Sequence, residues 1–376
     1  MASSAEVLAN VRSFHDEIDS PDRKGRTSNA PLLLVLESTS RCNFRCVHCS
    51  QTFNRQARAD MSVELFRKTG PAWKTALEVY LFGDGEVLLD IPRHLEMVSQ
   101  VREANPACSL GFSTNGKLLT PEVYGRYAAT GVQYIQVSID AATRELYDEM
   151  RRGGSFDDLI ANLEGIAALR RRSTGPQPRL HLATVISRQN YRQLPLLAEF
   201  AKRYEFSYWY ISAEYFHNPG RGRLRLAAED LVELARSRAE IVRRYGSHYS
   251  VFFDPSIGLR PEARGAWFES KSPVYCTVPW QRFELKANGD VKVCPYFLEP
   301  ICSVNGKSFA EVWNGPEFRR IRMAFASGTG VPSYCVNCNL AMRKQYVRRY
   351  PFPFDPGGSG PLARVIRRTR KLIERI

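Results

Sequence analysis

The sequence predicts an α/β protein, in which a partial (β/α)6 TIM-like barrel is followed by a small cysteine-rich α+β domain. Two observations predict this architecture. From Pro31 onward, short β-type runs alternate with helical patterns, which is the signature of a parallel sheet. From Pro273 onward, cysteines become frequent and the strand-like runs become shorter. With 376 residues, the chain is long enough for a barrel and a second, smaller domain.

The barrel region holds six β-type runs separated by helical patterns. These runs are Leu32–Leu36, Glu78–Phe82, Ser109–Ser113, Tyr134–Ile139, Leu180–Ile186 and Ser207–Ile211. One helix has clear boundaries, because Thr120 can cap it, Pro121 suits its first position and Gly131 can end it. In parallel barrels, chemistry gathers at the carboxyl ends of the strands, so polar motifs at these ends are candidate site residues.

The remaining segments fit around this barrel. Residues 1–30 begin with an amphipathic helical pattern, and their apolar residues recur on one side. We therefore expect a helical arm at 1–30, the barrel at 31–215, a linker helix region at 216–272, the cysteine-rich domain at 273–348, and a linker with a basic tail helix at 349–376.

The last third of the chain carries its own local signals. Residues 282–294 fit a hairpin that turns at Asn288-Gly289, and Ser308 with Glu311 forms a capping box that predicts a helix. Near the C-terminus, apolar residues recur at helical spacing opposite a cationic face. Such a tail helix can dock on its own domain or lie on an anionic membrane surface, and we expect docking because the helix is short.

Charge and cysteine content exclude several function classes. The formal charge is +14, but the basic residues are scattered and form no recognisable nucleic-acid-binding module, so we expect no nucleic-acid partner. The nine cysteines are an odd number, and the first residues resemble no signal peptide. A secreted disulfide scaffold is therefore disfavoured, and we expect a cytoplasmic protein with reduced thiols.

Three cysteines follow the first β-type run at a distinctive spacing. Three residues separate Cys42 from Cys46, and two separate Cys46 from Cys49. Three thiolates can hold three corners of a [4Fe-4S] cube and leave one iron open to another ligand. A zinc site is the alternative, but zinc requires four ligands, and His48 cannot easily reach the same metal as its neighbour Cys49.

Polar loops follow the next three β-type runs. Gly83, Asp84, Gly85 and Glu86 come after the second run, Ser113 and Asn115 after the third, and Ser138 and Asp140 after the fourth. Such loops can supply the backbone acceptors and hydroxyl partners that a cofactor with an amino-acid end and a ribose requires. Each loop taken singly is a common turn. Their order behind the three cysteines makes the pattern specific.

In this arrangement the chain resembles the radical SAM superfamily over most of its length. The resemblance implies that residues 83–86 bind the methionyl amine of S-adenosylmethionine, although Val87 stands where the family usually has proline. It also implies that Ser113, Asn115, Ser138 and Asp140 contact the ribose or carboxylate. His48 matches the residue that lies against the adenine. The implied chemistry is reductive cleavage of S-adenosylmethionine to a 5′-deoxyadenosyl radical, which abstracts hydrogen from a substrate.

A second cysteine set lies in the C-terminal region. Cys276, Cys294, Cys335 and Cys338 can bind one iron–sulfur cluster or a structural zinc. Their spacing resembles the SPASM and shorter twitch extensions of radical SAM enzymes, which implies one auxiliary cluster and two [4Fe-4S] clusters in total. Cys302 lies outside this pattern and can be a buried small residue, a replacement ligand or a hydrogen-atom donor.

Substrate and reaction are less constrained by the sequence. Glu214, at the end of the sixth run, is a candidate for binding a substrate or accepting a proton. We expect a radical SAM oxidoreductase or epimerase that acts on a small polar metabolite, such as a sugar or aminocyclitol, in natural-product biosynthesis, because residues 1–30 cannot contain a leader-binding domain. The alternatives are a maturase that forms a crosslink or thioether in a ribosomal peptide with a separate leader-binding partner, and a zinc-binding scaffold. A flavodoxin- or ferredoxin-type protein is the expected electron donor.

Overall fold

The computed structural model describes most of the chain. The described residues are 4–20, 25–53, 57–213, 226–254, 276–295 and 299–332, together with positions 224, 257, 297 and 335. Glu214, Cys338 and the expected tail helix in 349–376 lie outside them.

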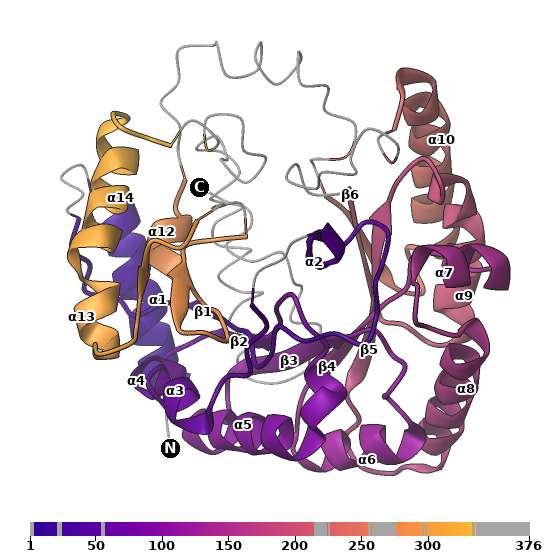
Figure 1. The fold of residues 1–376 in the computed structure, drawn as a ribbon, viewed down its shortest axis with the longest axis horizontal. Coiled ribbons are helices and arrows are strands. Elements are labelled where there is room, and N and C mark those ends of the chain that lie inside the picture. The colour runs from indigo at the N-terminus through magenta and orange to yellow at the C-terminus, as the bar shows by residue number, and fades with distance from the viewer. Residues whose placement is uncertain are drawn as a thin grey trace.

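A single ten-stranded sheet forms the centre of the fold (Figure 1). Its strands are β1 (Leu33–Leu36), β2 (Glu78–Leu81), β3 (Ser109–Thr114), β4 (Tyr134–Ser138), β5 (Arg179–Ile186), β6 (Tyr208–Ala213), β7 (Ser250–Phe253), β8 (Arg282–Leu285), β9 (Asp290–Lys292) and β10 (Cys302–Ser303). Their order is β10-β9-β8-β1-β2-β3-β4-β5-β6-β7. All pairs from β8 to β7 are parallel, and β9 pairs antiparallel with both β8 and β10. The predicted partial α/β barrel is confirmed.

The sheet is longer than the six predicted strands. β7 adds a parallel strand beyond β6, within the segment that we expected to be a linker. On the other side, the hairpin of β8 and β9 does form, but β8 also pairs with β1. The cysteine-rich region therefore continues the barrel sheet.

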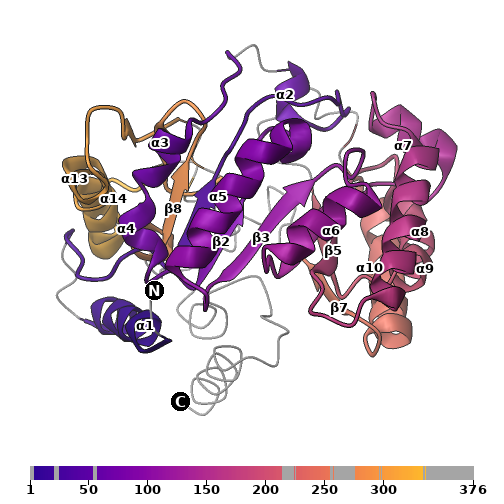
Figure 2. The ribbon, with the colours of Figure 1, turned by 90° about the horizontal axis from the view of Figure 1, so that it is seen from below.

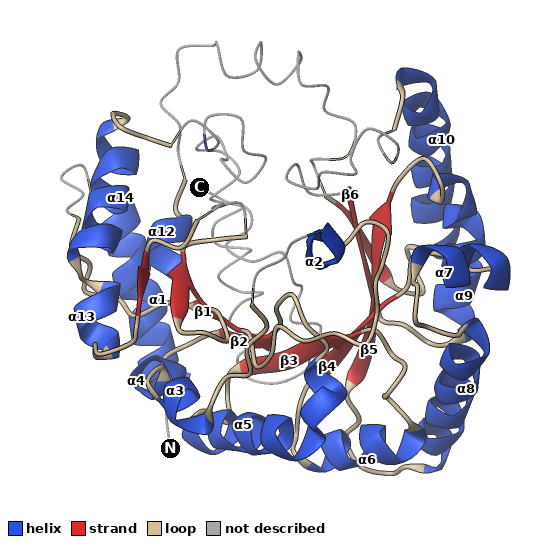
Figure 3. Cartoon of the chain, viewed as in Figure 1, coloured by secondary structure: helices blue, strands red, loops and turns tan. Residues whose placement is uncertain are grey.

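The helices lie mostly along the convex face of this curved sheet, although α2 (Ser50–Phe53) lies on its open, concave side (Figure 3). They are α1 (Ser4–Asp19), α2 (Ser50–Phe53), α3 (Val63–Arg67), α4 (Gly70–Trp73), η1 (Val87–Asp90), α5 (Ile91–Ala104), α6 (Pro121–Ala129), α7 (Arg144–Met150), α8 (Phe156–Arg172), η2 (Tyr191–Gln193), α9 (Leu194–Arg203), α10 (Ala228–Tyr245), α12 (Val278–Gln281), α13 (Phe309–Trp313) and α14 (Pro316–Ser327). Both predicted caps are present, at Thr120 for α6 and at Ser308 for α13. Among the described residues, no helix combines the length and apolarity that crossing a bilayer requires.

Alternate residues of the strands pack on opposite faces of the sheet, as the two-residue period of a strand requires. In β1, Leu34 and Leu36 belong to the main core between sheet and helices. Leu33 and Val35 instead join Tyr80 and Tyr134 in a small cluster on the concave face. The concave face is therefore partly apolar and partly aromatic.

The two ends of the strands have different neighbours. Asn10 of α1 donates to the carbonyls of Ala30 and Thr75, which lie just before β1 and β2. α1 therefore closes the amino ends of these strands, whereas α2 lies beyond their carboxyl ends (Figure 2). The first cysteine set and the predicted loops after β2, β3 and β4 follow the carboxyl ends of their strands, where α2 lies.

The concave face contains an ionisable pair that makes stability depend on pH. Burial raises the pKa of Glu78 from its ordinary value of 4.5 to about 7, although a hydrogen bond from Tyr134 opposes the shift. Because the pKa of Glu78 is higher in the folded protein than in the unfolded chain, the protonated carboxyl stabilises the fold. This stabilisation is complete below pH 4.5 and is lost as the pH rises through 7. Relative to Glu78→Gln, wild-type protein should lose roughly 3 kcal/mol of unfolding free energy between these limits, as measured by urea denaturation. Glu122 is exposed, so Glu122→Gln should show the same dependence of unfolding free energy on pH as the wild type. The prediction would be contradicted if the curve of Glu78→Gln ran parallel to that of the wild type.

Candidate active site

The first cysteine set lies in the loop that follows β1. Cys46 is buried, and Cys42 and Cys49 are half-buried. Burial raises the pKa of all three thiols, that of Cys46 to about 12, and the charge of Cys49 further raises the pKa of Cys42 and Cys46. The charge of Arg151 lowers the pKa of each. The three sulfur atoms therefore share one environment, in which each is affected by the guanidinium of Arg151.

This donor set fits an iron–sulfur cluster with one iron lacking a protein ligand. Within the described residues, no three His, Cys, Asp or Glu side chains converge on a point where one metal ion could be held. A cubane does not require such convergence, because each thiolate binds a different iron. Cys42, Cys46 and Cys49 are the residues that would hold it.

The loop of residues 83–86 lies directly against the cysteine loop. A Cβ atom on Gly85 would lie 2.5 Å from the carbonyl oxygen of Arg41, so only glycine allows this approach. The amide of Glu86 donates to the same oxygen at 2.8 Å. The cysteine loop and the predicted amine-binding loop are therefore fixed to each other through backbone contacts.

Glu86 connects this loop to the one that follows β3. Its carboxylate accepts hydrogen bonds from the Thr114 hydroxyl and the Asn115 amide, both at 2.6 Å, and it is 2% exposed. The side chain of Asn115 in turn donates to Asn43, between the first two cysteines, at 2.8 Å. The structure thus joins three predicted site segments in one hydrogen-bonded unit.

Ser113 and Ser138 point to the concave side of the sheet. Ser113 is buried and accepts a long hydrogen bond from Gln136 at 3.5 Å, and Ser138 is half-buried at the end of β4. Gln136 is 7% exposed, and its Oε1 atom has no hydrogen-bond partner. Direct contact of the two serines with a cofactor stays a prediction.

Asp140 contacts two side chains that lie near the cysteines, those of Arg151 and His48. It is fully buried, and its carboxylate accepts from the Val185 amide at 2.8 Å and pairs with Arg151 at 2.7 Å. The same carboxylate lies 3.3 Å from Nε2 of His48. Burial lowers the pKa of His48, and the charge of Asp140 opposes this shift. Asp140 therefore fixes both the cation facing the thiols and the ring predicted to lie against adenine.

Arg151 is a site residue that the sequence analysis missed. It lies at the end of α7, 5% exposed. Burial disfavours its charge, but Asp140 and Cys46 overcome that effect and raise its pKa, so the guanidinium stays charged. In the sequence it stands beside Arg152, which is exposed, and nothing distinguishes the two.

The second cysteine set is partly described. Cys276 precedes α12, Cys294 follows β9, and Cys294 and Cys335 are buried. Cys302 lies half-buried on β10, opposite Val291 of β9, and burial raises its pKa to about 11. The metal ligands and the role of Cys302 stay predictions.

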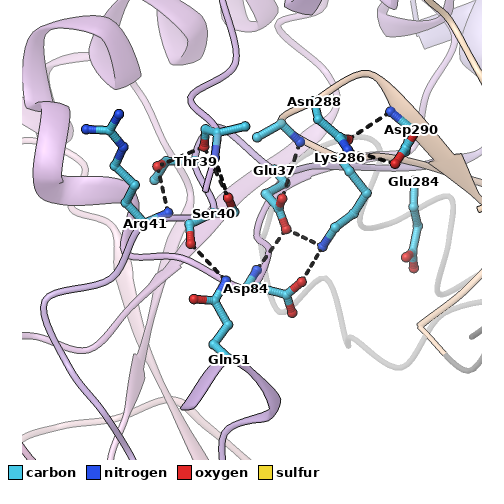
Figure 4. Close-up of polar contacts among 12 residues, drawn as sticks. Glu37, Thr39, Ser40, Arg41, Gln51, Asp84, Glu284, Lys286, Asn288 and Asp290 are labelled. Carbon is cyan, nitrogen blue, oxygen red and sulfur yellow. Dashed lines mark hydrogen bonds and ion pairs between the residues drawn. The ribbon is translucent and has the colours of Figure 1, made fainter. Parts of the chain in front are cut away.

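Glu37 and Lys286 are two further residues that the sequence analysis missed (Figure 4). Glu37 directly follows β1 and Lys286 directly follows β8. Lys286 forms ion pairs with Glu37 and with Asp84 of the predicted amine-binding loop. In the sequence, Glu37 could have been recognised as a charged residue directly after an apolar run. Lys286 follows a run of mixed polarity, where a charged residue is not unusual.

Comparison with known proteins identifies two regions of similarity. Residues 36–201 match the model of the radical SAM superfamily, and residues 276–339 match the SPASM iron–sulfur cluster-binding domain. The mycofactocin maturase MftC of Mycolicibacterium smegmatis is 30% identical, over 83% of this chain and 76% of its own. The tungsten-containing aldehyde ferredoxin oxidoreductase cofactor-modifying protein of Pyrococcus furiosus is 31% identical, over 84% and 89%.

A solved structure supports the same fold. SuiB of Streptococcus suis, bound to precursor peptide SuiA, superposes with a TM-score of 0.62 at 16% identity, covering 91% of this chain and 76% of SuiB. At this identity the similarity concerns the fold alone.

These comparisons overturn one prediction. The expectation of a small polar metabolite, such as a sugar or aminocyclitol, is wrong, because similarity to a maturase extends over most of the chain. Since that substrate class is wrong, the expected dehydrogenation or epimerisation of such a metabolite is no longer supported. That prediction depended on the shortness of residues 1–30, but leader binding by a separate protein needs no such segment.

The buried pair of Arg151 and Asp140 should dominate the stability of the site. Arg151→Met leaves a fully buried carboxylate without its cation and should lower the unfolding free energy by about 3 kcal/mol. The neighbouring substitution Arg152→Met is the matched control, because Arg152 is exposed, and it should have no measurable effect. Urea denaturation under anaerobic conditions measures both, and equal stability of the two variants would contradict the prediction.

Proposed function

Because this chain belongs to the radical SAM superfamily and carries a SPASM domain, we propose that it is a maturase that modifies a peptide, forming a crosslink or a thioether. The family's cofactors are S-adenosylmethionine and a [4Fe-4S] cluster, and the SPASM domain adds an auxiliary iron–sulfur cluster. The observation that carries the proposal is the similarity to mycofactocin maturase over 83% of the chain.

The chain's own residues have separable tasks in this proposal. When bound, the cluster and S-adenosylmethionine supply a radical that can remove hydrogen from an unactivated carbon. Cys42, Cys46 and Cys49 hold the cluster, and Arg151 balances the charge of their thiolates. The 83–86 loop receives the methionyl amine. Cys276, Cys294, Cys335 and Cys338 hold the auxiliary cluster.

The concave face offers a surface suited to an extended peptide. Half-buried Phe82 stacks on Tyr80 with ring centroids 5.2 Å apart, and Tyr210 stacks on Phe252 at 5.7 Å. Tyr210 also donates a hydrogen bond to Asp254 at 2.7 Å. Within the described strands, β7 and β10 end the sheet without pairing with each other, so the sheet is not closed between them. Tyr210 and Phe252 lie on β6 and β7, beside the open edge, whereas Tyr80 and Phe82 lie at β2, in the middle of the sheet. Aromatic side chains are enriched at binding surfaces, and an open sheet edge can pair with an extended peptide.

Two protein partners complete the proposal. A flavodoxin- or ferredoxin-type protein supplies the electron, and a separate leader-binding protein presents the peptide. Iron–sulfur ligation by reduced thiols suits a cytoplasmic location.

An anaerobic assay with candidate peptides tests the substrate class. Reduced protein, S-adenosylmethionine and short peptides encoded beside its gene should yield 5′-deoxyadenosine and a peptide of altered mass, measured by mass spectrometry. Proteins encoded nearby should be added as candidate leader-binding partners. Formation of 5′-deoxyadenosine without any change in the peptides, with a neighbouring metabolite altered instead, would overturn the peptide proposal.

Iron analysis tests the assignment of the first cluster. Wild-type protein should contain about eight irons per chain, and Cys46→Ala should retain about four, because the auxiliary cluster uses other ligands. Cys108→Ala is a matched control, since Cys108 is buried just before the amino end of β3 and is not a predicted ligand, and it should keep the full iron content. Stoichiometric zinc, or unchanged iron in Cys46→Ala, would contradict the assignment.

A further inference from the structure

Three charged residues meet where neighbouring strands end. Glu37 follows β1, Asp84 follows β2, and Lys286 follows β8. β1 pairs with β2 on one side and with β8 on the other, so the three carboxyl ends lie together at one edge. Figure 4 shows the Lys286 ammonium between the two carboxylates.

Glu37 is the buried centre of this cluster. Its side chain is 3% exposed, and its carboxylate accepts from the amide of Asp84 at 2.9 Å and the amide of Ala287 at 3.2 Å. It also forms an ion pair with Lys286. The carboxylate therefore binds the 83–86 loop and the β8–β9 hairpin at the same time. Removing the lysine would leave this carboxylate buried without a cation.

Lys286 also holds the loop directly. Its ammonium lies 2.6 Å from the carboxylate of Asp84, which is half-exposed. Burial lowers the pKa of Lys286, but the charges of Glu37 and Asp84 overcome that effect and raise it, so the side chain stays charged. Asp84 stands between Gly83 and Gly85, whose lack of side chains gives the loop little stiffness of its own. The position of this loop therefore depends on its contacts.

The close packing of the loop leaves little room for adjustment. A Cβ atom on Gly83 would overlap the side chain of Glu37, and one on Gly85 would overlap the backbone of Thr39 and Arg41. The loop thus lies packed between the cysteine loop and the side chain of Glu37. We therefore expect movement of Glu37 to displace the loop.

We propose that Lys286 is a positioning residue for S-adenosylmethionine, which acts from the auxiliary-cluster hairpin by holding the 83–86 loop in place through Glu37 and Asp84. This inference rests on the proposed role of that loop in binding the methionyl amine. It assigns the SPASM region a task at the other cofactor, separate from holding its own cluster.

Lys286→Met tests the proposal, because methionine keeps the length of the side chain without its charge. The Kd for S-adenosylmethionine, measured by equilibrium dialysis with reconstituted protein, should rise about tenfold, while the rate of cleavage at saturating cofactor should change less than twofold. Lys286→Arg should restore most of the affinity. Lys292→Met, a change of the same kind on β9 of the same hairpin, should bind as the wild type does.

Hydrogen exchange provides a second measurement that needs no turnover. In protein without S-adenosylmethionine, the amide of Asp84 should exchange faster in Lys286→Met than in Lys292→Met, because its acceptor Glu37 has lost its cation. Equal affinities and equal exchange in the two variants would overturn the inference, and so would tighter binding by Lys286→Met. Failure of the wild type to bind S-adenosylmethionine would overturn the proposed function as well.

Discussion

The parallel pairing of β1 with strands on both sides is the constraint on which the site depends. β1 lies between β2 and β8, so the segments that follow these three strands leave the sheet at one edge. The cysteine loop follows β1, the 83–86 loop follows β2, and the hairpin follows β8. Residues nearly 250 positions apart, such as Glu37 and Lys286, are thereby brought into contact. A shift of register in β1 would move its side chains to the opposite face of the sheet and separate all three segments.

At this edge of the sheet, positively charged side chains are paired with acidic groups. Two cations lie here, Arg151 buried and Lys286 half-buried. Arg151 faces Asp140 and the thiols, and Lys286 faces Glu37 and Asp84. Both cations keep their charge despite burial. The edge is therefore arranged for groups that carry charge, as a thiolate-bound cluster and a sulfonium cofactor do.

Much of the fold could be predicted from the sequence because its signals are local. Strand runs, the Asn288-Gly289 turn and the caps at Thr120 and Ser308 depend on nearby residues, and the cysteine spacings are specific. β7 was missed because it lies after α10, in a segment that was interpreted as a linker. Arg151 and Lys286 were missed because their roles depend on contacts between distant segments, which no local pattern records. The substrate class was wrong because it was inferred from a segment's length instead of from any residue that touches a substrate.

The position of α1 has a practical consequence for handling the protein. Asn10 ties this helix to the amino ends of β1 and β2, on the side away from the cysteine loop. An affinity tag or a surface linker joined ahead of this helix would emerge at the base of the barrel. If the protein were immobilised in this way, the carboxyl ends of its strands, with the cysteine loop, would face the solution.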